Sequence, residues 1–532
     1  MKSLYTSLLI VLLFNSIGFP QTLWNQNNEK ETSTVDLTPV IYIPGIMGSP
    51  MYDDVNDDDK LIWEEKAWIG PEFFSMWLAD NGIDPASGDY NIKVAPLRND
   101  TENTLRDELN DDPLNLFKGF FDNLEANGYI LDNYNDVHNE GENLFCFPYD
   151  WRKNNTYNAE LLSDFIDSVI NWTGAEEVNL VGHSMGGIVS KQCINLFDKS
   201  RIDKMVFIGT PHLGAPEILT VMLKGKLFEW LNFFIANIVV RDFVRNLPSG
   251  YQLIPTRSYF NFEFNNGVST DVEIYSECLQ LPDGSYTNYS ELIDYLRIYS
   301  SSLGENLNVA LLDSSEFFKE NIDTVDFGEV EVFNIVGYNK WTIGKNSVII
   351  GPPPLYWISI EEERNLNGDF TVPVRSAELI NNQVIENTYY IPDIIHSALP
   401  SGQPTLEILL GIFSDPPITY FPQYADPPPS YKFLISDVKN DLEIPISFSL
   451  SQNFPNPFNP ITTIRYQLPV AGNITLRLYD VLGNEIATLV DEEKSGGTYE
   501  IIFYAGNLPS GVYFYQLQTE GYVETKKMIL LR

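Results

Sequence analysis

The chain has 532 residues, room for about two to four domains, and its 44% hydrophobic content excludes a mostly disordered protein. Its formal net charge of −40 excludes a surface that binds nucleic-acid phosphates or is attracted to an anionic membrane. Three cysteines are too few for a disulfide framework, so we expect stability to come from packing.

The N-terminus has the pattern of an export signal. Met1-Lys2 is followed by an apolar run from Leu8 to Phe14 and then by small and turn-forming residues. The run is too short to span a bilayer, so it predicts a cleaved secretory signal peptide over residues 1–21. A buried helix is the less favoured alternative, because a polar, Asn-rich stretch follows at once.

The region 35–412 alternates strand-like and helix-like segments. Short apolar runs typical of buried strands recur between helix-like stretches, and they lie at Val40–Ile43, Val178–Val181, Met205–Ile208 and Val332–Val336. This alternation predicts a mostly parallel sheet with helices on both faces.

A change in composition separates this region from the C-terminus. Residues 413–445 are rich in proline and are expected to form a linker. Residues 446–532 carry six basic and eight acidic side chains, so nearly all of the negative charge lies before them. Apolar and polar residues alternate there between turn residues, which predicts a small β-sandwich.

The sequence Gly182-His183-Ser184-Met185-Gly186 has the G-x-S-x-G pattern. It follows a buried strand and precedes apolar residues at helical spacing, the context of a nucleophile elbow. In such a turn, small residues two positions either side of the serine are required, and the hydroxyl lies at a helix N-terminus. Ser184 is therefore the candidate nucleophile, with a helix-capping serine as the alternative.

A serine nucleophile needs a base, and the chain has four histidines. His138 and His183 precede the serine, and His212 follows it too closely to leave room for an acid between them. In enzymes with such a nucleophile elbow, the three residues follow one another along the chain in the order serine, acid, histidine. By elimination His396 is the candidate base, the alternative being a surface-loop histidine.

The acid is expected at the end of the strand before that histidine. Asp369 lies there, after Gly368, which permits a tight turn. Asp393 is the rival, but it is only three residues from His396 and is better explained as a loop-capping residue.

Two backbone N–H groups are expected to form an oxyanion hole. The Met185 N–H directly follows the nucleophile. The second is expected from the glycine-containing loop 44–49, and Ile46 is the candidate, with an ordinary glycine turn as the alternative.

Residues 214–265 are expected to form a cap over the site. As one helix, the central part of this region would be apolar over much of its circumference, and we expect that helix to line an acyl-chain channel. The large apolar residues are Leu227, Phe228, Trp230, Leu231, Phe233, Phe234, Ile235, Ile238, Val239 and Val240. A helix packed wholly into the core is the alternative. A second aromatic group is either an interfacial patch or core, and it comprises Trp63, Trp68, Phe73, Phe74 and Trp77.

No motif indicates a cofactor or a metal. The acidic loop at Asp53, Asp54 and 57–59 lacks the spacing of an EF-hand, so a solvated loop is expected.

These motifs together resemble the lecithin:cholesterol acyltransferase family of α/β-hydrolases. The matching segments follow in order: Pro44–Gly48, Pro148-Tyr149-Asp150-Trp151-Arg152, Gly182–Gly187, Gly209–Pro216, Gly368–Pro373 and His396. The resemblance implies a doubly wound sheet with a helical cap, Ser184 as nucleophile, Asp369 as acid, His396 as base, and Ile46 and Met185 as oxyanion amides. Phe370 stands where the family usually has a second glycine. The disulfides of vertebrate members have no counterpart, so Cys146 and Cys193 are expected as buried free thiols.

The C-terminus resembles a type A sorting domain of the type IX secretion system. The resemblance covers residues 446–532 and rests on these motifs: Phe454–Pro460, Leu478–Gly483, Leu508–Tyr513 and Lys526-Lys527. It implies the secretion machinery as a partner, and a bacterial protein that is secreted or held at the outer cell surface. A substrate-binding β-module is the alternative.

The resulting expectation is a secreted serine-dependent hydrolase or O-acyltransferase of lipid-like esters, with possible transient contact with a lipid surface. A carboxylesterase or polyester depolymerase is the enzymatic alternative. A non-catalytic surface-binding protein on a hydrolase scaffold is the alternative from another class.

Overall fold

The computed structural model describes residues 37–53, 60–63, 78–84, 92–94, 118–132, 141–225, 237–260, 278–281, 287–302, 307–350, 357–428, 447–453, 456–458, 461–505, 508–519 and 521–531. The expected signal peptide, the apolar residues 227–235 of the cap, the acidic residues 54–59 and the aromatic residues Trp68, Phe73, Phe74 and Trp77 lie outside the described residues.

A six-stranded parallel sheet forms the centre of the α/β part. Its strand order is β14-β9-β7-β6-β1-β5. The strands are β1 (Val40–Ile43), β5 (Leu144–Cys146), β6 (Val178–His183), β7 (Ile202–Ile208), β9 (Glu331–Tyr338) and β14 (Thr388–Pro392). Every neighbouring pair is parallel. The sequence prediction of a parallel sheet built on the four apolar runs is confirmed.

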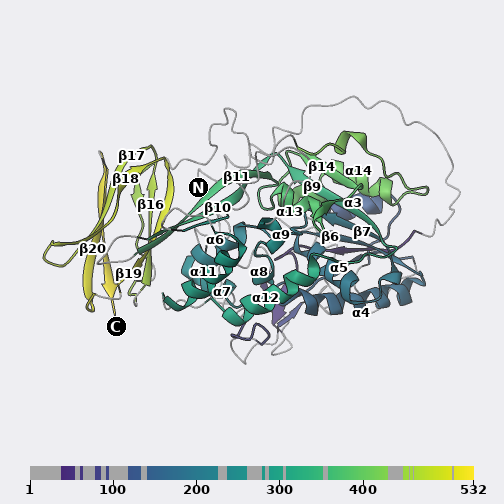
Figure 1. Ribbon diagram of the computed structural model, residues 1–532, viewed down its shortest axis with the longest axis horizontal. Helices are drawn as coiled ribbons and strands as arrows, with labels where there is room; N and C mark the ends of the chain where they lie inside the picture. The colour runs from purple at the N-terminus through teal and green to yellow at the C-terminus, as the bar shows by residue number, and fades with distance from the viewer. Residues whose placement is uncertain are drawn as a thin grey trace. The chain divides into compact units, whose positions relative to one another are not determined.

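Helices cover both faces of this sheet, as the alternation of side chains along β1 demonstrates. Ile41 and Ile43 belong to the core cluster that includes Leu162 of α4 (Asn155–Thr173) and Val189 of α5 (Met185–Leu196). Tyr42 points to the opposite face, where its ring packs 4.6 Å from that of Phe120 in α3 (Lys118–Ala126). Figure 1 shows α4 and α5 on one side of β6 and β7, and α3 and α14 (Gln403–Ile412) on the other.

Shorter elements surround the sheet. The remaining described α-helices are α6 (Glu217–Lys224), α7 (Asn237–Val244), α8 (Pro248–Gln252), α9 (Arg257–Phe260), α11 (Tyr289–Ser302), α12 (Val309–Ile322) and α13 (Val374–Glu378). Small sheets join β2 (Met51–Asp53) to β3 (Lys60–Trp63) and β4 (Ile92–Val94), and β12 (Leu379–Ile380) to β13 (Gln383–Val384).

A long antiparallel hairpin interrupts the parallel sheet after β9. It consists of β10 (Lys340–Ile350) and β11 (Trp357–Gly368), and β10 also pairs with β8 (Leu279–Gln280). The hairpin brings the chain back so that Asp369 bridges to Lys340, beside the end of β9.

The C-terminal part is all-β, as its alternating pattern predicts. One sheet has the order β18-β17-β20-β21, and the other contains β15, β16 and β19, the last of which pairs with β11. The strands are β15 (Ser449–Leu450), β16 (Ile461–Leu468), β17 (Gly472–Tyr479), β18 (Glu485–Lys494), β19 (Gly497–Tyr504), β20 (Gly511–Gln518) and β21 (Val523–Leu530). The apolar residues of both sheets share one buried cluster, among them Leu476, Leu478, Phe503 and Tyr515.

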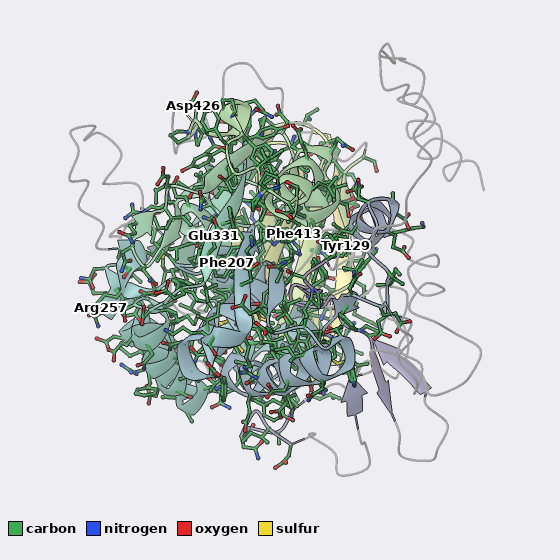
Figure 2. All side chains as sticks on the ribbon, turned by 90° about the vertical axis from the view of Figure 1, so that its right-hand side faces the viewer. Tyr129, Phe207, Arg257, Glu331, Phe413 and Asp426 are labelled. Atoms are coloured by element: carbon green, nitrogen blue, oxygen red, sulfur yellow. The ribbon has the colours of Figure 1, made fainter. Side chains whose placement is uncertain are left out.

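The first residues of the expected linker pack against the α/β part. Phe421 is buried, and its ring lies 5.6 Å from that of Tyr389 in β14. The Tyr389 hydroxyl donates to the Thr419 carbonyl. Tyr129, after α3, and Phe413, after α14, also pack together (Figure 2). This packing favours a linker that begins after Ala425 rather than at residue 413.

The cap region does not form a single helix in its described residues. Helix α6 ends at Lys224, because Gly225 adopts a left-handed conformation with φ 73° and its N–H bonds to the Val221 carbonyl. A separate helix, α7, follows, and Val240 and Phe243 on it are buried in the main core. This part of the predicted cap is therefore core packing. Within the described ranges, no helix is long and apolar enough to cross a membrane.

Helix α5 approaches the end of β1 so closely that only glycine fits. A methyl group on Gly186 would lie 2.2 Å from the Ile43 carbonyl oxygen and 2.4 Å from that of Pro44. We predict that Gly186→Ala destabilises the protein by about 1–3 kcal/mol, the usual cost of overpacking, in denaturant-induced unfolding. Gly250→Ala is the matched control, because a methyl group on Gly250 would lie no closer than 3.4 Å to its nearest neighbour, the Met222 methyl group. Equal losses of stability in the two variants would contradict the conclusion that only glycine fits at position 186.

Candidate active site

Ser184 occupies the sharp turn between β6 and α5. Its φ of 53° and ψ of −126° are unusual for a residue with a side chain, and such strain costs about 1–3 kcal/mol. The turn is fixed because the Ser184 N–H bonds to the Ile208 carbonyl at 2.9 Å on the neighbouring strand. Gly187 allows the helix to start there, since a methyl group on it would lie 1.9 Å from Thr210 Oγ1.

Three side chains from distant parts of the sequence form one hydrogen-bonded chain. His396 Nε2 lies 2.8 Å from Ser184 Oγ, and His396 Nδ1 lies 2.7 Å from Asp369 Oδ2. The carboxylate can only accept, so Nδ1 carries the proton and Nε2 is free to accept the proton of the serine hydroxyl. The structure thus brings together the three residues that the sequence singled out.

The carboxylate of Asp369 is fully buried and held in one orientation. Its Oδ1 accepts the N–H groups of Thr371 and Val372 at 3.1 Å and 2.8 Å, which leaves Oδ2 for His396. Gly209 makes room for this arrangement, because a methyl group on it would lie 3.2 Å from Asp369 Oδ2. Asp393, the rival candidate, is exposed and accepts a bond from Asn339 Nδ2 instead.

Asp369 reaches the site by a route that the sequence pattern did not predict. It was expected at the end of a strand and directly follows β11, but this strand belongs to the antiparallel hairpin rather than to the parallel sheet. Because the hairpin returns to where it left, Asp369 still lies at the carboxyl end of β9. A methyl group on Gly337, near the end of β9, would lie 2.8 Å from Asp369 Cβ.

The loop after β1 lies directly against the serine. A methyl group on Gly45 would be 2.9 Å from Ser184 Cβ and 3.4 Å from Ser184 Oγ. The Ile46 amide is the next one along this loop. The Met185 amide is in the first turn of α5, where N–H groups have no acceptor within the helix. Both candidate oxyanion amides therefore belong to segments adjoining the serine.

Tyr149 forms hydrogen bonds with both ends of this loop. Its hydroxyl donates to the Pro44 carbonyl at 2.9 Å, and its N–H donates to Ser49 Oγ at 3.1 Å. The Pro-Tyr-Asp-Trp-Arg segment was recognised in the sequence, but this role of its tyrosine was not. The role follows from the order of strands in the sheet, because Tyr149 comes after β5, and β5 lies beside β1.

Several groups act on the pKa of His396 in opposite directions. Burial favours the neutral ring, but the Asp369 charge, its hydrogen bond and the more distant Glu217 charge outweigh it and raise the pKa above its ordinary value of 6.5. Glu217 is the first residue of α6, and nothing in the sequence pattern singled it out.

Phe370 occupies a backbone conformation suited to glycine. Its φ is 88°, its N–H donates to Thr342 Oγ1, and its ring packs 5.2 Å from that of Trp341. This explains physically why the related motif has glycine here. The aromatic pair now forms the wall next to the acid.

All three cysteines lie in the described part of the chain, and none of them forms a disulfide. Cys193 is buried as expected, and burial raises its pKa to about 12, whereas Cys146 is only partly buried. The part of the chain that the structure describes contains no cluster of histidine, cysteine or acidic side chains suited to a metal ion.

We predict that NMR titration of His396 gives a pKa above that of an ordinary histidine. Asp369→Asn removes the larger favourable charge and should lower this pKa, and Glu217→Gln should lower it less. Because the folded-state pKa is raised, the contribution to stability is present below about pH 6.5 and is lost as the pH rises through the folded-state value. A titration at or below the ordinary value in the wild type would contradict this.

Comparison with known proteins places both parts of the chain. Residues 104–342 match the family described as lecithin:cholesterol acyltransferase, and residues 452–531 match the secretion system C-terminal sorting domain. The chain is 26% identical over 418 residues to lecithin-cholesterol acyltransferase-like 4 of Arabidopsis thaliana, covering 70% of this chain and 74% of that protein.

Two solved structures also match the chain, at low sequence identity. A chain in the crystal structure of the Tle4–Tli4 complex has 15% sequence identity and a TM-score of 0.44, and the match covers 69% of this chain and 96% of that chain. The mature lipase BlEst2 of Bacillus licheniformis is 12% identical with a TM-score of 0.29, covering 73% and 96%. The chain thus has an α/β-hydrolase fold in which residues 104–342 match the lecithin:cholesterol acyltransferase family, followed by residues 452–531, which match the secretion system C-terminal sorting domain.

Proposed function

We propose that the protein is an exported serine-dependent acyl-ester hydrolase or O-acyltransferase that works through an acyl-enzyme on Ser184. The observation that carries this proposal is the hydrogen-bonded chain from Ser184 through His396 to Asp369. The match to a family of acyltransferases supports the same reaction class.

In the first half-reaction Ser184 Oγ attacks the ester carbonyl carbon while His396 Nε2 takes the hydroxyl proton. The carbonyl oxygen becomes an oxyanion that the Met185 and Ile46 N–H groups bind. The Asp369 carboxylate accepts the Nδ1–H bond and stabilises the imidazolium. The tetrahedral intermediate then expels the alcohol, which takes the proton from His396, and leaves the acyl group on Ser184.

In the second half-reaction an incoming hydroxyl group attacks the acyl-enzyme. His396 removes its proton and returns it to Ser184 Oγ, so the enzyme is regenerated. Water as acceptor gives hydrolysis, and an alcohol gives acyl transfer. The two reactions use the same residues and differ only in the acceptor that reaches the site.

The substrate class and the location form the finer part of the proposal. A lipid-like ester is supported by the name of the plant relative and by the apolar composition of residues 227–235. Secretion or display at the outer surface of a bacterium is supported by the sorting domain, through which the chain would contact the export machinery.

We predict that the wild type hydrolyses nitrophenyl esters, with turnover that rises with acyl-chain length. Ser184→Ala should lower kcat by about 10³-fold or more, because the covalent route is lost. Addition of a long-chain alcohol tests transfer, since alkyl ester product would identify an acyltransferase.

Ser168→Ala is the matched control, because this serine lies on the exposed side of α4, where its hydroxyl bonds to the Asp164 carbonyl. It should retain turnover. Turnover restricted to short esters would overturn the lipid-like substrate and leave the reaction class. A folded wild type without turnover on any ester would favour a non-catalytic binding protein.

We predict that Tyr149→Phe lowers kcat/KM by about fivefold or more, because the loop that carries Ile46 loses one anchor. The buried Pro44 carbonyl would lose its partner, at a cost of about 1–3 kcal/mol in stability. Tyr389→Phe removes a similar hydroxyl-to-carbonyl bond far along the sheet and should lower stability alone. Equal activity losses in both variants would contradict the role of Tyr149.

A further inference from the structure

His183 is the residue directly before the nucleophile, and the reaction proposed above makes no use of it. It is the last residue of β6, and only 5% of its surface is exposed. Its ring centroid lies 4.8 Å from that of His396. An imidazole buried so deeply needs a reason, because a buried polar group costs free energy unless it is hydrogen-bonded.

One ring nitrogen of His183 contacts the backbone of the candidate base. His183 Nε2 lies 3.1 Å from the His396 carbonyl oxygen. A carbonyl only accepts, so Nε2 must carry the proton and donate it. Nδ1 then holds a lone pair, which has no partner among the described residues. It faces the loop after β1, since a methyl group on Gly45 would lie 3.3 Å from it.

The surroundings of His183 also determine the charge of its ring. Burial, and secondly the neighbouring His396, hold the pKa of His183 well below the ordinary value. The ring therefore stays neutral when His396 accepts a proton. A neutral neighbour adds no repulsive charge to the imidazolium, yet it keeps its N–H available as a donor.

Three hydrogen bonds together define the position of His396. Its N–H donates to the Asp369 carbonyl at 2.7 Å, and its Nδ1–H donates to the Asp369 carboxylate at 2.7 Å. The bond from His183 holds the carbonyl at the other end of the same residue. It is the one bond of the three that does not involve Asp369. His396 begins a 3₁₀ helix (His396–Ser401) in which Leu399 is fully buried, so packing holds the chain after the base, and the bond from His183 holds the carbonyl of the base itself.

We propose that His183 is a positioning residue: its Nε2–H holds the His396 backbone so that the imidazole stays aligned between Ser184 Oγ and Asp369. The proposal rests on the proposed function, and it assigns to His183 a task that a side chain of equal size without a donor cannot perform. A shift of about 1 Å in a catalytic group can cost about 10²-fold in rate, so a single anchoring bond can matter.

The test compares His183→Phe, which fills the space without a donor, with His183→Gln, whose side-chain amide retains one. We expect His183→Phe to lower kcat about tenfold or more with KM changed less than about twofold, and His183→Gln to recover most of the loss. The acid limb of the pH profile should move to lower pH in His183→Phe, because the bond to Asp369 loosens while Glu217 stays in place.

His212→Phe is the matched control. His212 is also a buried histidine, held neutral first by burial and then by the nearby Lys191, and its ring packs 4.8 Å from Phe207. It should leave the acid limb in place even if stability falls. Melting temperatures of all variants separate misfolding from misplacement of the base.

Two results would overturn the proposal. One is a folded His183→Phe that keeps kcat and the acid limb of the wild type. The other is a folded His183→Gln as impaired as His183→Phe, which would make ring shape the requirement rather than the donor. If the wild type itself shows no turnover, the proposed function fails separately. The proton NMR signal of the His396 Nδ1–H bond then still reports on position, and His183→Phe alone should shift it.

Discussion

The contact between the start of α5 and the end of β1 determines the geometry of the candidate site. The Cα of Gly186 packs against the carbonyl oxygens of Ile43 and Pro44, at a distance that no larger residue permits. This contact forces the chain to turn sharply at Ser184, with φ at 53°. It also places the loop after β1 against the serine side chain. One steric constraint therefore sets both the backbone turn that carries the hydroxyl and the position of the amides beside it.

The other half of the site depends on hydrogen bonds rather than on close packing. The Asp369 carboxylate is oriented by two backbone N–H groups, and the backbone and ring of His396 are both bonded to Asp369. Because these groups are buried, each bond is stronger than it would be in water, and an unpaired group would be costly. The electrostatic outcome is a His396 whose pKa is raised despite its burial, so the imidazolium that forms when the ring accepts the serine proton is more stable than that of an ordinary histidine.

Much of this could be predicted from the sequence because the deciding signals are local. The apolar run at residues 178–181 and the glycines around Ser184 predict strand, turn and helix without any tertiary information. The candidate base was predicted by elimination, since the chain has only four histidines. The features that the sequence could not indicate depend on long-range packing. Residues 413–425 look like a linker by their prolines, yet Phe421 is buried against β14. The route of Asp369 through a hairpin and the anchoring by Tyr149 depend on which strands become neighbours.

The most direct measurement is mass spectrometry of the protein after rapid acid quenching during turnover of an ester substrate. The account predicts an added mass equal to the acyl group, on the peptide that contains Ser184, and its disappearance when a fast acceptor alcohol is added. An acyl group found on another residue, or turnover with no covalent intermediate under conditions where deacylation is slowed, would contradict it.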